Sequence, residues 1–529
     1  MIKREGNYVL HPDSKEGVGE FFKIKEFIDE YAMNFSVFKL SRKEALKEVL
    51  IIHSEFVFMH NQGRVRALPD IKMDFRNNEV LIQESLKWAI KLIYKFCEEK
   101  PKKNNLIKPT RKEIIEFIIY CYKLDLFYNL FNSAGKGQYH IKLLDNRISF
   151  HSSSENNGFL AYNSWRQAYR ERKQINDINS VDRKAIQEVH MSDFHMPEEW
   201  DLGAYTLAEF KEVSKQIDKL CTAWFINHLR ENKYVVVGKY RADGLVKINH
   251  KNWWVNQLVD LTGFSTKVIE SIVDDLTYVD TNNSDPCYQF FIQLKNNELA
   301  LPAGFVASFV RPERNLIAYL PKKDQKLFSR LSNDCEDQQI QYIKKKLKNS
   351  GIIVISKKTK AQDKREGMDL MLLDPKSLDL LIIELKWRIP PASAREMYGT
   401  DEAINKGIKQ IKKAEEWVEK NLNSILKEYL GEDYSKTVPK RISYCVVINE
   451  NIGAGSGCEL LDPIITVDHL LELLEHGLGH TINCLDTREH RIPQKYIKMK
   501  PLSFNISNFK FEFSGTELLG EWLDKVLEK

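Results

Sequence analysis

The sequence lacks the features that mark several large classes of protein. No stretch approaches the ~18 uninterrupted apolar residues that a membrane span needs, and the opening MIKREGNYVLHPDSKEG has no apolar run suited to a signal peptide. The eight cysteines include no CxxC pair, which predicts reduced thiols rather than a disulfide framework or a zinc ribbon. The glycine-rich stretch at 453–457 is not followed by Gly-Lys-Ser/Thr, which argues against a nucleotide-binding loop. We therefore expect a cytoplasmic protein that does not enter a membrane.

The composition is typical of a folded protein with several domains. At 529 residues the chain is too long for one hydrophobic core, and its length alone suggests about three domains. Hydrophobic residues make up 43% and aromatic residues 11%, which argues against a disordered chain. The net charge of +5 permits nucleic-acid binding without arguing for it, so that function must be inferred from where the charge lies.

Residues 1–232 are predicted to form a mainly helical region. Segments 81–100, 111–131 and 206–232 place apolar residues at three- and four-residue intervals, which is the period of an amphipathic helix. The Ser- and Asn-rich stretch 149–158 predicts an exposed loop or a domain boundary. None of these segments carries a chemical motif, so we expect a sensor, a scaffold or a surface that contacts other proteins.

Residues 233–330 are predicted to form a winged-helix-like α+β segment. Residues 255–279 have the pattern helix, tight turn, helix, and residues 288–304 have the pattern strand, turn, strand around Asn296-Asn297. The second helix carries one Lys against one Glu and two Asp, so it would repel phosphates where a DNA-reading helix must dock. This acidic helix favours a protein-interaction role over DNA reading.

Positive charge is concentrated just before the most informative segment of the chain. Between Lys344 and Glu366 there are nine basic residues against two acidic ones, which suits contact with a polyanion. A basic run that stands alone is usually a solvated surface, but this one leads into a segment with catalytic features. The candidate nucleic-acid-binding residues are Lys344, Lys345, Lys346, Lys348, Lys357, Lys358, Lys360, Lys364 and Arg365.

That segment is GMDLMLLDPKSLDLLIIELKW, residues 367–387. It predicts a hairpin of two apolar strands that closes about Pro375-Lys376, which would place Asp369 opposite Ile382. Because side chains two apart on a strand share a face, Asp369, Glu384 and Lys386 are expected to project to one side. The two carboxylates would then be diagonal neighbours, roughly 7–8 Å apart at the backbone.

Acidic side chains on strands this apolar need a physical explanation. Burying two like charges and a lysine without partners would cost several kcal/mol. Carboxylate oxygens are the hard ligands that Mg²⁺ prefers, and a bound cation would remove the repulsion. The ion could activate a water at a phosphodiester, while Lys386 orients that water or stabilises the developing charge.

The spacing D-x14-E-x-K, formed by Asp369, Glu384 and Lys386, resembles the PD-(D/E)xK nuclease superfamily, also called the restriction-endonuclease-like fold. The surrounding pattern is similar too, and the resemblance covers about residues 331–480. It implies a C-terminal domain, 331–529, with an α/β core, a mixed central sheet and bound Mg²⁺, for which Mn²⁺ can substitute. The expected core elements are a helix at 337–351, a strand at 352–360, the hairpin, a helix at 395–421 and a strand at 442–449.

Two further site residues follow from the resemblance. Branches of the superfamily place a glutamine on the long helix facing the active site, and Gln410 lies on the apolar stripe of 395–421. A glutamine at a helix edge is the alternative. Many members also carry an acidic residue on the first helix as a metal ligand. Glu336 is our choice, with Asp337 and Gln341 as alternatives.

We therefore expect a Mg²⁺-dependent endonuclease that hydrolyses phosphodiester bonds. The resemblance favours double-stranded DNA over RNA as the substrate and suggests a role in restriction or anti-phage defence. One alternative is a catalytically silent nuclease fold that binds nucleic acid or serves in assembly, and another is a regulatory scaffold with incidental cleavage. A homodimer and a protein partner bound through residues 1–330 both stay open.

Overall fold

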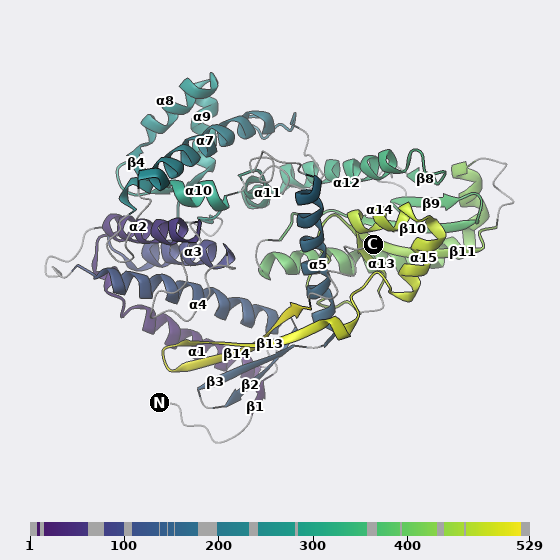
Figure 1. The fold of residues 1–529 in the computed structure, drawn as a ribbon, viewed down its shortest axis with the longest axis horizontal. Coiled ribbons are helices and arrows are strands. Elements are labelled where there is room, and N and C mark those ends of the chain that lie inside the picture. The colour runs from purple at the N-terminus through teal and green to yellow at the C-terminus, as the bar shows by residue number, and fades with distance from the viewer. Residues whose placement is uncertain are drawn as a thin grey trace.

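The computed structural model describes most of the chain, and the statements below concern the described residues (Figure 1). The described ranges are 8–10, 15–61, 79–99, 108–136, 138–144, 146–152, 154–177, 198–231, 242–280, 284–310, 312–356, 368–391, 394–430, 438–459 and 462–519. None of the helices in these ranges combines the length and apolar character that crossing a membrane demands. Each of the eight cysteines lies in a described range and is a free thiol.

A group of antiparallel helices forms the N-terminal region and shares one hydrophobic core. The helices predicted at 81–100 and 111–131 are present as α3 and α4. A capping box starts α4, in which the Thr110 side chain accepts from the Glu113 N–H and the Glu113 carboxylate accepts from the Thr110 N–H. The helices are α1 (Lys15–Ala32), α2 (Arg42–Asn61), α3 (Glu79–Phe96) and α4 (Arg111–Gly135).

A five-stranded sheet beside these helices joins the two ends of the chain (Figure 1). It contains β1 (Tyr8–Leu10), β2 (Tyr139–Leu144), β3 (Arg147–Ser152), β14 (Phe509–Leu518) and β13 (Ile497–Ile506), in that spatial order. Because β14 pairs with β3, the predicted unit 331–529 gives its last two strands to the N-terminal region. The loop predicted at 149–158 is replaced by β3 and the start of α5 (Ser154–Asp177).

The middle segment contains the predicted helix–turn–helix and hairpin. Asn296 and Asn297 both have positive φ, 53° and 61°, as a tight two-residue hairpin turn requires. The sheet order is β4-β7-β6-β5. The elements are β4 (Val246–His250), α8 (Lys251–Thr262), α9 (Thr266–Asp275), β5 (Thr277–Tyr278), β6 (Phe291–Gln293), β7 (Glu298–Pro302), α10 (Ala303–Phe309) and α11 (Pro312–Lys323). The helix predicted at 206–232 is present as α7 (Leu207–Glu231), but it shares the hydrophobic core of this segment instead of belonging to the helical region 1–232.

The C-terminal α/β unit is built on a mixed sheet of order β12-β11-β10-β9-β8. The first three strands along the chain are antiparallel neighbours, and β10, β11 and β12 are parallel. Its strands are β8 (Ile353–Ser356), β9 (Leu370–Asp374), β10 (Asp379–Lys386), β11 (Arg441–Ile448) and β12 (Ile464–Thr466). The predicted order helix, strand, hairpin, helix, strand is observed.

Helices cover both faces of this sheet, which explains why its strands are almost continuously apolar. On one face, α13 packs against side chains such as Leu380 and Ile382. The opposite face, with Leu381 and Ile383, packs against the other three helices. The helices are α12 (Gln325–Leu347), α13 (Ala394–Leu430), α14 (Val467–Glu475) and α15 (Leu478–Thr487).

Candidate active site

Asp369, Glu384 and Lys386 meet at one edge of the mixed sheet. Glu384 and Lys386 are at the carboxyl end of β10, and Asp369 directly precedes β9. Glu384 and Lys386 share the strand face of Leu380 and Ile382, which is the face that α13 covers. Glu384 and Lys386 therefore lie on one face of the sheet, as the two-residue period of a strand predicts.

The predicted register of the hairpin is wrong by two residues. Ile382 pairs with Met371 rather than Asp369, because the turn between Asp374 and Asp379 contains four residues. Leu378 adopts a left-handed φ of 61° in this turn, and its N–H donates to the Asp374 carbonyl at 2.9 Å. A shift of two residues preserves the face of every side chain, so Asp369 moves level with Glu384 instead of diagonal to it.

Direct contacts order the three side chains. The Asp369 carboxylate accepts a hydrogen bond from the Leu385 N–H at 2.8 Å. The Lys386 ammonium donates to Glu384 Oε1 and, at 3.1 Å, to the Leu385 carbonyl. Glu384 Oε2 is buried and has no hydrogen-bond partner among the described residues. An unsatisfied carboxylate oxygen beside a second acidic group is the kind of position that a cation completes.

Burial makes ionisation of this acidic pair costly. Burial, together with the neighbouring Asp369 carboxylate, raises the pKa of Glu384 to about 8, against the opposing effect of Lys386. Burial also raises the pKa of Asp369, although the Leu385 N–H and Lys386 favour its ionised form. Without a cation, the site therefore holds fewer negative charges at neutral pH than its residue types suggest.

Glu336 joins this group from α12. Its carboxylate is half-buried and lies near the backbone N–H of Trp387, the residue after Lys386, which favours its ionised form. Burial raises the pKa of Glu336 and the Asp369 charge adds to this, while Lys386 and Lys406 oppose it. Asp337 and Gln341, the two alternatives, are both exposed. The helix thus presents Glu336, rather than either alternative, to the end of β10.

The long helix α13 lies directly over Lys386. A Cβ added at Gly407 would lie 3.4 Å from Lys386 Cε and 2.9 Å from Val446 Cγ1, so the helix backbone approaches the strand closely here. Gln410, almost one turn further along, is half-buried. Its Oε1 is a buried acceptor with no hydrogen-bond partner in the described part of the chain. This placement suits a residue that receives a hydrogen bond from a ligand.

The four predicted basic residues that the structure describes lie away from the site. Lys344, Lys345, Lys346 and Lys348 lie at the carboxyl-terminal end of α12, eight or more residues beyond Glu336, or about 12 Å along the helix. Lys345, Lys346 and Lys348 are exposed there and Lys344 is half-buried. The remaining five candidates, Lys357, Lys358, Lys360, Lys364 and Arg365, lie outside the described residues.

The acidic side chains at the site form a small donor set for a metal ion. In the described ranges, no group of three or more His, Cys, Asp or Glu side chains is arranged closely enough to hold one. The chemistry nevertheless fits a hard cation shared by two carboxylates, because Glu384 Oε2 is unsatisfied beside Asp369. Asp369 and Glu384 would hold the ion directly. Glu336 is near enough for the charge of Asp369 to raise its pKa.

Two supporting groups were not predicted from the sequence. The Asn449 side chain accepts from the Arg388 N–H at 2.9 Å and donates to the Arg388 carbonyl at 2.7 Å, which fixes the segment leaving β10. Asp401 of α13 accepts from the N–H groups of Ala454 and Gly455 at 2.8 and 3.1 Å. The only sequence signal for either group was a polar or glycine-rich segment just after an apolar strand.

Comparison with known proteins adds no relative: neither a family model, nor a curated protein, nor a solved structure matches this chain.

Proposed function

We propose that this protein is a metal-dependent nuclease of the PD-(D/E)xK type that hydrolyses phosphodiester bonds. The observation that carries the proposal is the convergence of Asp369, Glu384 and Lys386 at one sheet edge, with Glu384 Oε2 buried and unsatisfied. Other carboxylates, such as Asp468, also have a buried oxygen without a hydrogen-bond partner among the described residues. The feature that supports a cation as the ligand is the combination of this oxygen with a second carboxylate of raised pKa, Asp369, directly beside it.

Each residue has a role that its position allows. A Mg²⁺ or Mn²⁺ ion, when bound, supplies Lewis acidity toward a phosphate oxygen and lowers the pKa of a water. Asp369 and Glu384 would hold that ion between their carboxylates. Lys386 holds its ammonium beside Glu384, where it can orient the attacking water or stabilise negative charge on the phosphate. Gln410 offers an unsatisfied amide oxygen from the covering helix.

The substrate and the biological role are proposals by resemblance. Double-stranded DNA is favoured over RNA, and restriction or anti-phage defence is the favoured setting. A catalytically silent nuclease fold would have the same geometry but would not cleave nucleic acid. Only a cleavage assay separates this alternative from an active nuclease. The described residues 1–330 would supply recognition, assembly or control.

The test uses isosteric changes that keep the fold. Full-length protein, Glu384→Gln and Lys386→Met are incubated with single- and double-stranded DNA and RNA, with Mg²⁺, with Mn²⁺ or with chelator. We expect wild-type cleavage that requires the cation and falls at least ~100-fold in both variants. Lys376→Met, at an exposed position in the turn of the same hairpin, is the matched control and should cleave normally.

Equal background from wild type and both variants on every substrate would leave the silent fold as the better explanation. Urea unfolding of each variant shows whether reduced cleavage reflects chemistry or stability. Since Gln at 384 keeps the shape of the protonated carboxyl and cannot ionise, that variant should be no less stable than wild type in cation-free buffer.

A further inference from the structure

Arg314 of α11 binds two points of the chain that follows Lys386, one before α13 and one in its first turn. Its Nε and Nη2 donate to the Pro390 carbonyl at 3.0 and 2.8 Å. Its Nη2 also donates to the Glu396 carboxylate, which accepts from the Tyr288 hydroxyl as well. The Arg314 side chain is only 12% exposed, so these contacts are largely shielded from water.

The two partners of Arg314 are significant because of where they lie in the sequence. Pro390 is four residues beyond Lys386, on the segment that leaves β10. Glu396 is in the first turn of α13, whose Gly407 and Gln410 lie over the site. One guanidinium therefore joins the segment behind the catalytic lysine to the start of the helix that covers it.

Three contacts anchor the segment that leaves β10, and they come from different parts of the chain. Glu336 lies near the Trp387 N–H, and Asn449 binds both backbone groups of Arg388. Both belong to elements of the α/β unit. Arg314 provides the third contact, at Pro390, and it belongs to the middle segment instead.

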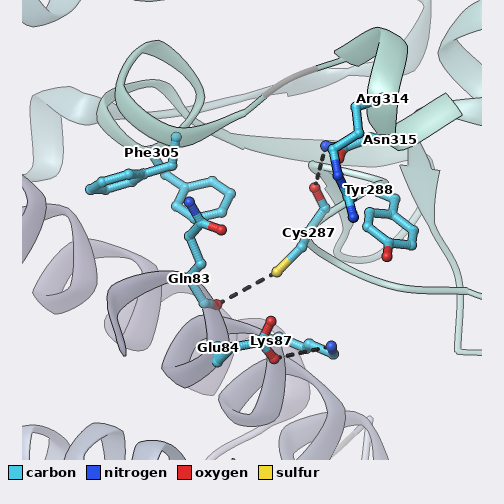
Figure 2. A pocket seen from close by; sticks show the side chains of 9 residues that line it. Gln83, Glu84, Lys87, Cys287, Tyr288, Phe305, Arg314 and Asn315 are labelled. Carbon is cyan, nitrogen blue, oxygen red and sulfur yellow. Dashed lines mark hydrogen bonds and ion pairs between the residues drawn. The ribbon is translucent and has the colours of Figure 1, made fainter. Parts of the chain in front are cut away.

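The same network continues away from the site toward the N-terminal helices. Asn315, next to Arg314, donates to the Cys287 carbonyl at 2.8 Å, and the Cys287 N–H donates to Asp285 at 3.0 Å. Asp285 in turn pairs with Lys87 of α3 at 3.2 Å. Lys87, Cys287, Arg314 and Asn315 line a cavity of about 30 Å³. Figure 2 shows this cavity with Lys87 of α3 on one side and Tyr288 and Arg314 on the other.

We propose that Arg314 is a positioning residue through which the middle segment controls the placement of Lys386. This inference rests on the proposed nuclease function, because it names the control of that same site. The geometry explains why arginine is required: its planar fork reaches the Pro390 carbonyl with two N–H groups while also binding Glu396. A lysine keeps the charge but cannot make this set of contacts.

The experiment compares Arg314→Lys with the same substitution at Arg441, a more exposed arginine that contacts the other end of the candidate catalytic strand. Arg441→Lys removes a two-contact pair with Asp379 at the opposite end of β10. Cleavage by the full chain is measured as separate kcat and KM values at saturating Mg²⁺. Hydrogen exchange is measured on peptides covering 387–391 and 394–400, both with and without the cation.

We expect Arg314→Lys to lower kcat roughly 10- to 100-fold with little change in KM, because a misplaced lysine affects the chemical step more than binding. Exchange at 387–391 and 394–400 should be faster in that variant and unchanged in Arg441→Lys. If Arg314→Lys does not fold, Tyr288→Phe removes only the hydroxyl contact to Glu396 and should shift both readouts in the same direction by a smaller factor.

The outcomes separate this inference from the proposed function. Normal kcat and normal exchange in Arg314→Lys, with an active wild type, would overturn the inference and leave the nuclease standing. An equal fall of kcat in Arg441→Lys would also overturn it, since the effect would then be general destabilisation. An inactive wild type contradicts the nuclease proposal, and unchanged exchange in Arg314→Lys would then refute the positioning role as well.

Discussion

The Lys386 ammonium donates to Glu384 Oε1 from two residues along the same strand, while Glu384 Oε2 is buried without a partner among the described residues. The lysine therefore neutralises only part of the charge that Glu384 and Asp369 would carry together. Burial and Asp369 raise the pKa of Glu384 to about 8, so near neutral pH the cation-free site retains a proton on this group.

The first prediction concerns pH in cation-free buffer. From the ordinary Glu pKa of ~4.3 up to about 8, the folded protein holds a proton on Glu384 that the unfolded chain has released. The free energy of unfolding should therefore fall as pH rises through this window, with Asp369 contributing in the same direction. In Glu384→Gln the fall should be shallower, as urea unfolding between pH 5 and 9 will show.

The same protonation predicts how the cation binds. Mg²⁺ or Mn²⁺ must displace the proton from Glu384, so its affinity should increase from pH 6 to about 8 and level off above that, with release of close to one proton for each ion bound at pH 6–7. Calorimetry in two buffers of different ionisation enthalpy measures the released proton. Binding that is independent of pH and buffer would show that Glu384 is not a ligand.

The second prediction concerns the close approach of α13 to the sheet. Gly407→Ala places a methyl group 2.9 Å from Val446 Cγ1, and Val446 is fully buried in a central strand. Overpacking should lower the free energy of unfolding by about 1–3 kcal/mol. This loss outweighs the ~1 kcal/mol of stability that alanine contributes through its higher helix propensity. Gly399→Ala, in the same helix with no described heavy atom within 4 Å, is the control and should stabilise by ~0.5–1 kcal/mol. Denaturant midpoints of the two variants should move in opposite directions.

The placement of the three candidate catalytic residues could be predicted because strand periodicity is local. An apolar strand fixes which side chains share a face, so Glu384 and Lys386 were correctly placed together. The register could not be predicted, because it depends on Leu378 adopting a left-handed conformation that leucine rarely adopts. The error was an even number of residues, and for that reason it did not move Asp369 to the other face.

Contacts between distant segments account for most of what the sequence could not indicate. No local sequence pattern predicts that β14 pairs with β3, which lies more than 350 residues earlier. Any apolar strand of suitable length could pair with an open sheet edge. The contact of Arg314 with Pro390 could not be predicted from the sequence either, because an arginine in a helix is usually exposed to solvent. Glu336 could be named only with alternatives, as the facing side of a helix depends on packing.

The third prediction separates stability from function at Gln410. Its Oε1 is buried without a described hydrogen-bond partner, so replacing it with methionine of similar shape removes an unsatisfied polar group. Gln410→Met should be as stable as wild type or up to ~1 kcal/mol more stable. If the amide contacts the substrate, cleavage should nevertheless fall about 10-fold, which is a typical effect of removing one hydrogen bond. Unchanged cleavage would identify Gln410 as a helix-edge residue with no part in the reaction.

The fourth prediction concerns the exposed lysines at the end of α12. Replacing Lys345, Lys346 and Lys348 by glutamate should weaken DNA binding and flatten the dependence of log Kd on log[salt], by up to ~0.9 for each phosphate that a lysine no longer neutralises. Their distance from Glu336 predicts that kcat at saturating substrate stays within about twofold of wild type. Removing the favourable charges at the helix end should cost a few tenths of a kcal/mol per residue.

The matched control replaces three other exposed lysines by glutamate, which gives the same change in net charge. These are Lys495, Lys498 and Lys500. If the α12 lysines contact the DNA backbone, their reversal should alter the salt slope and that of the control should not, because screening confines the effect of a distant charge to about 8–10 Å. Equal slopes in the two triple variants would mean that net charge alone attracts DNA. The nucleic-acid surface would then have to be sought on other elements around the site, such as the Lys406 side of α13.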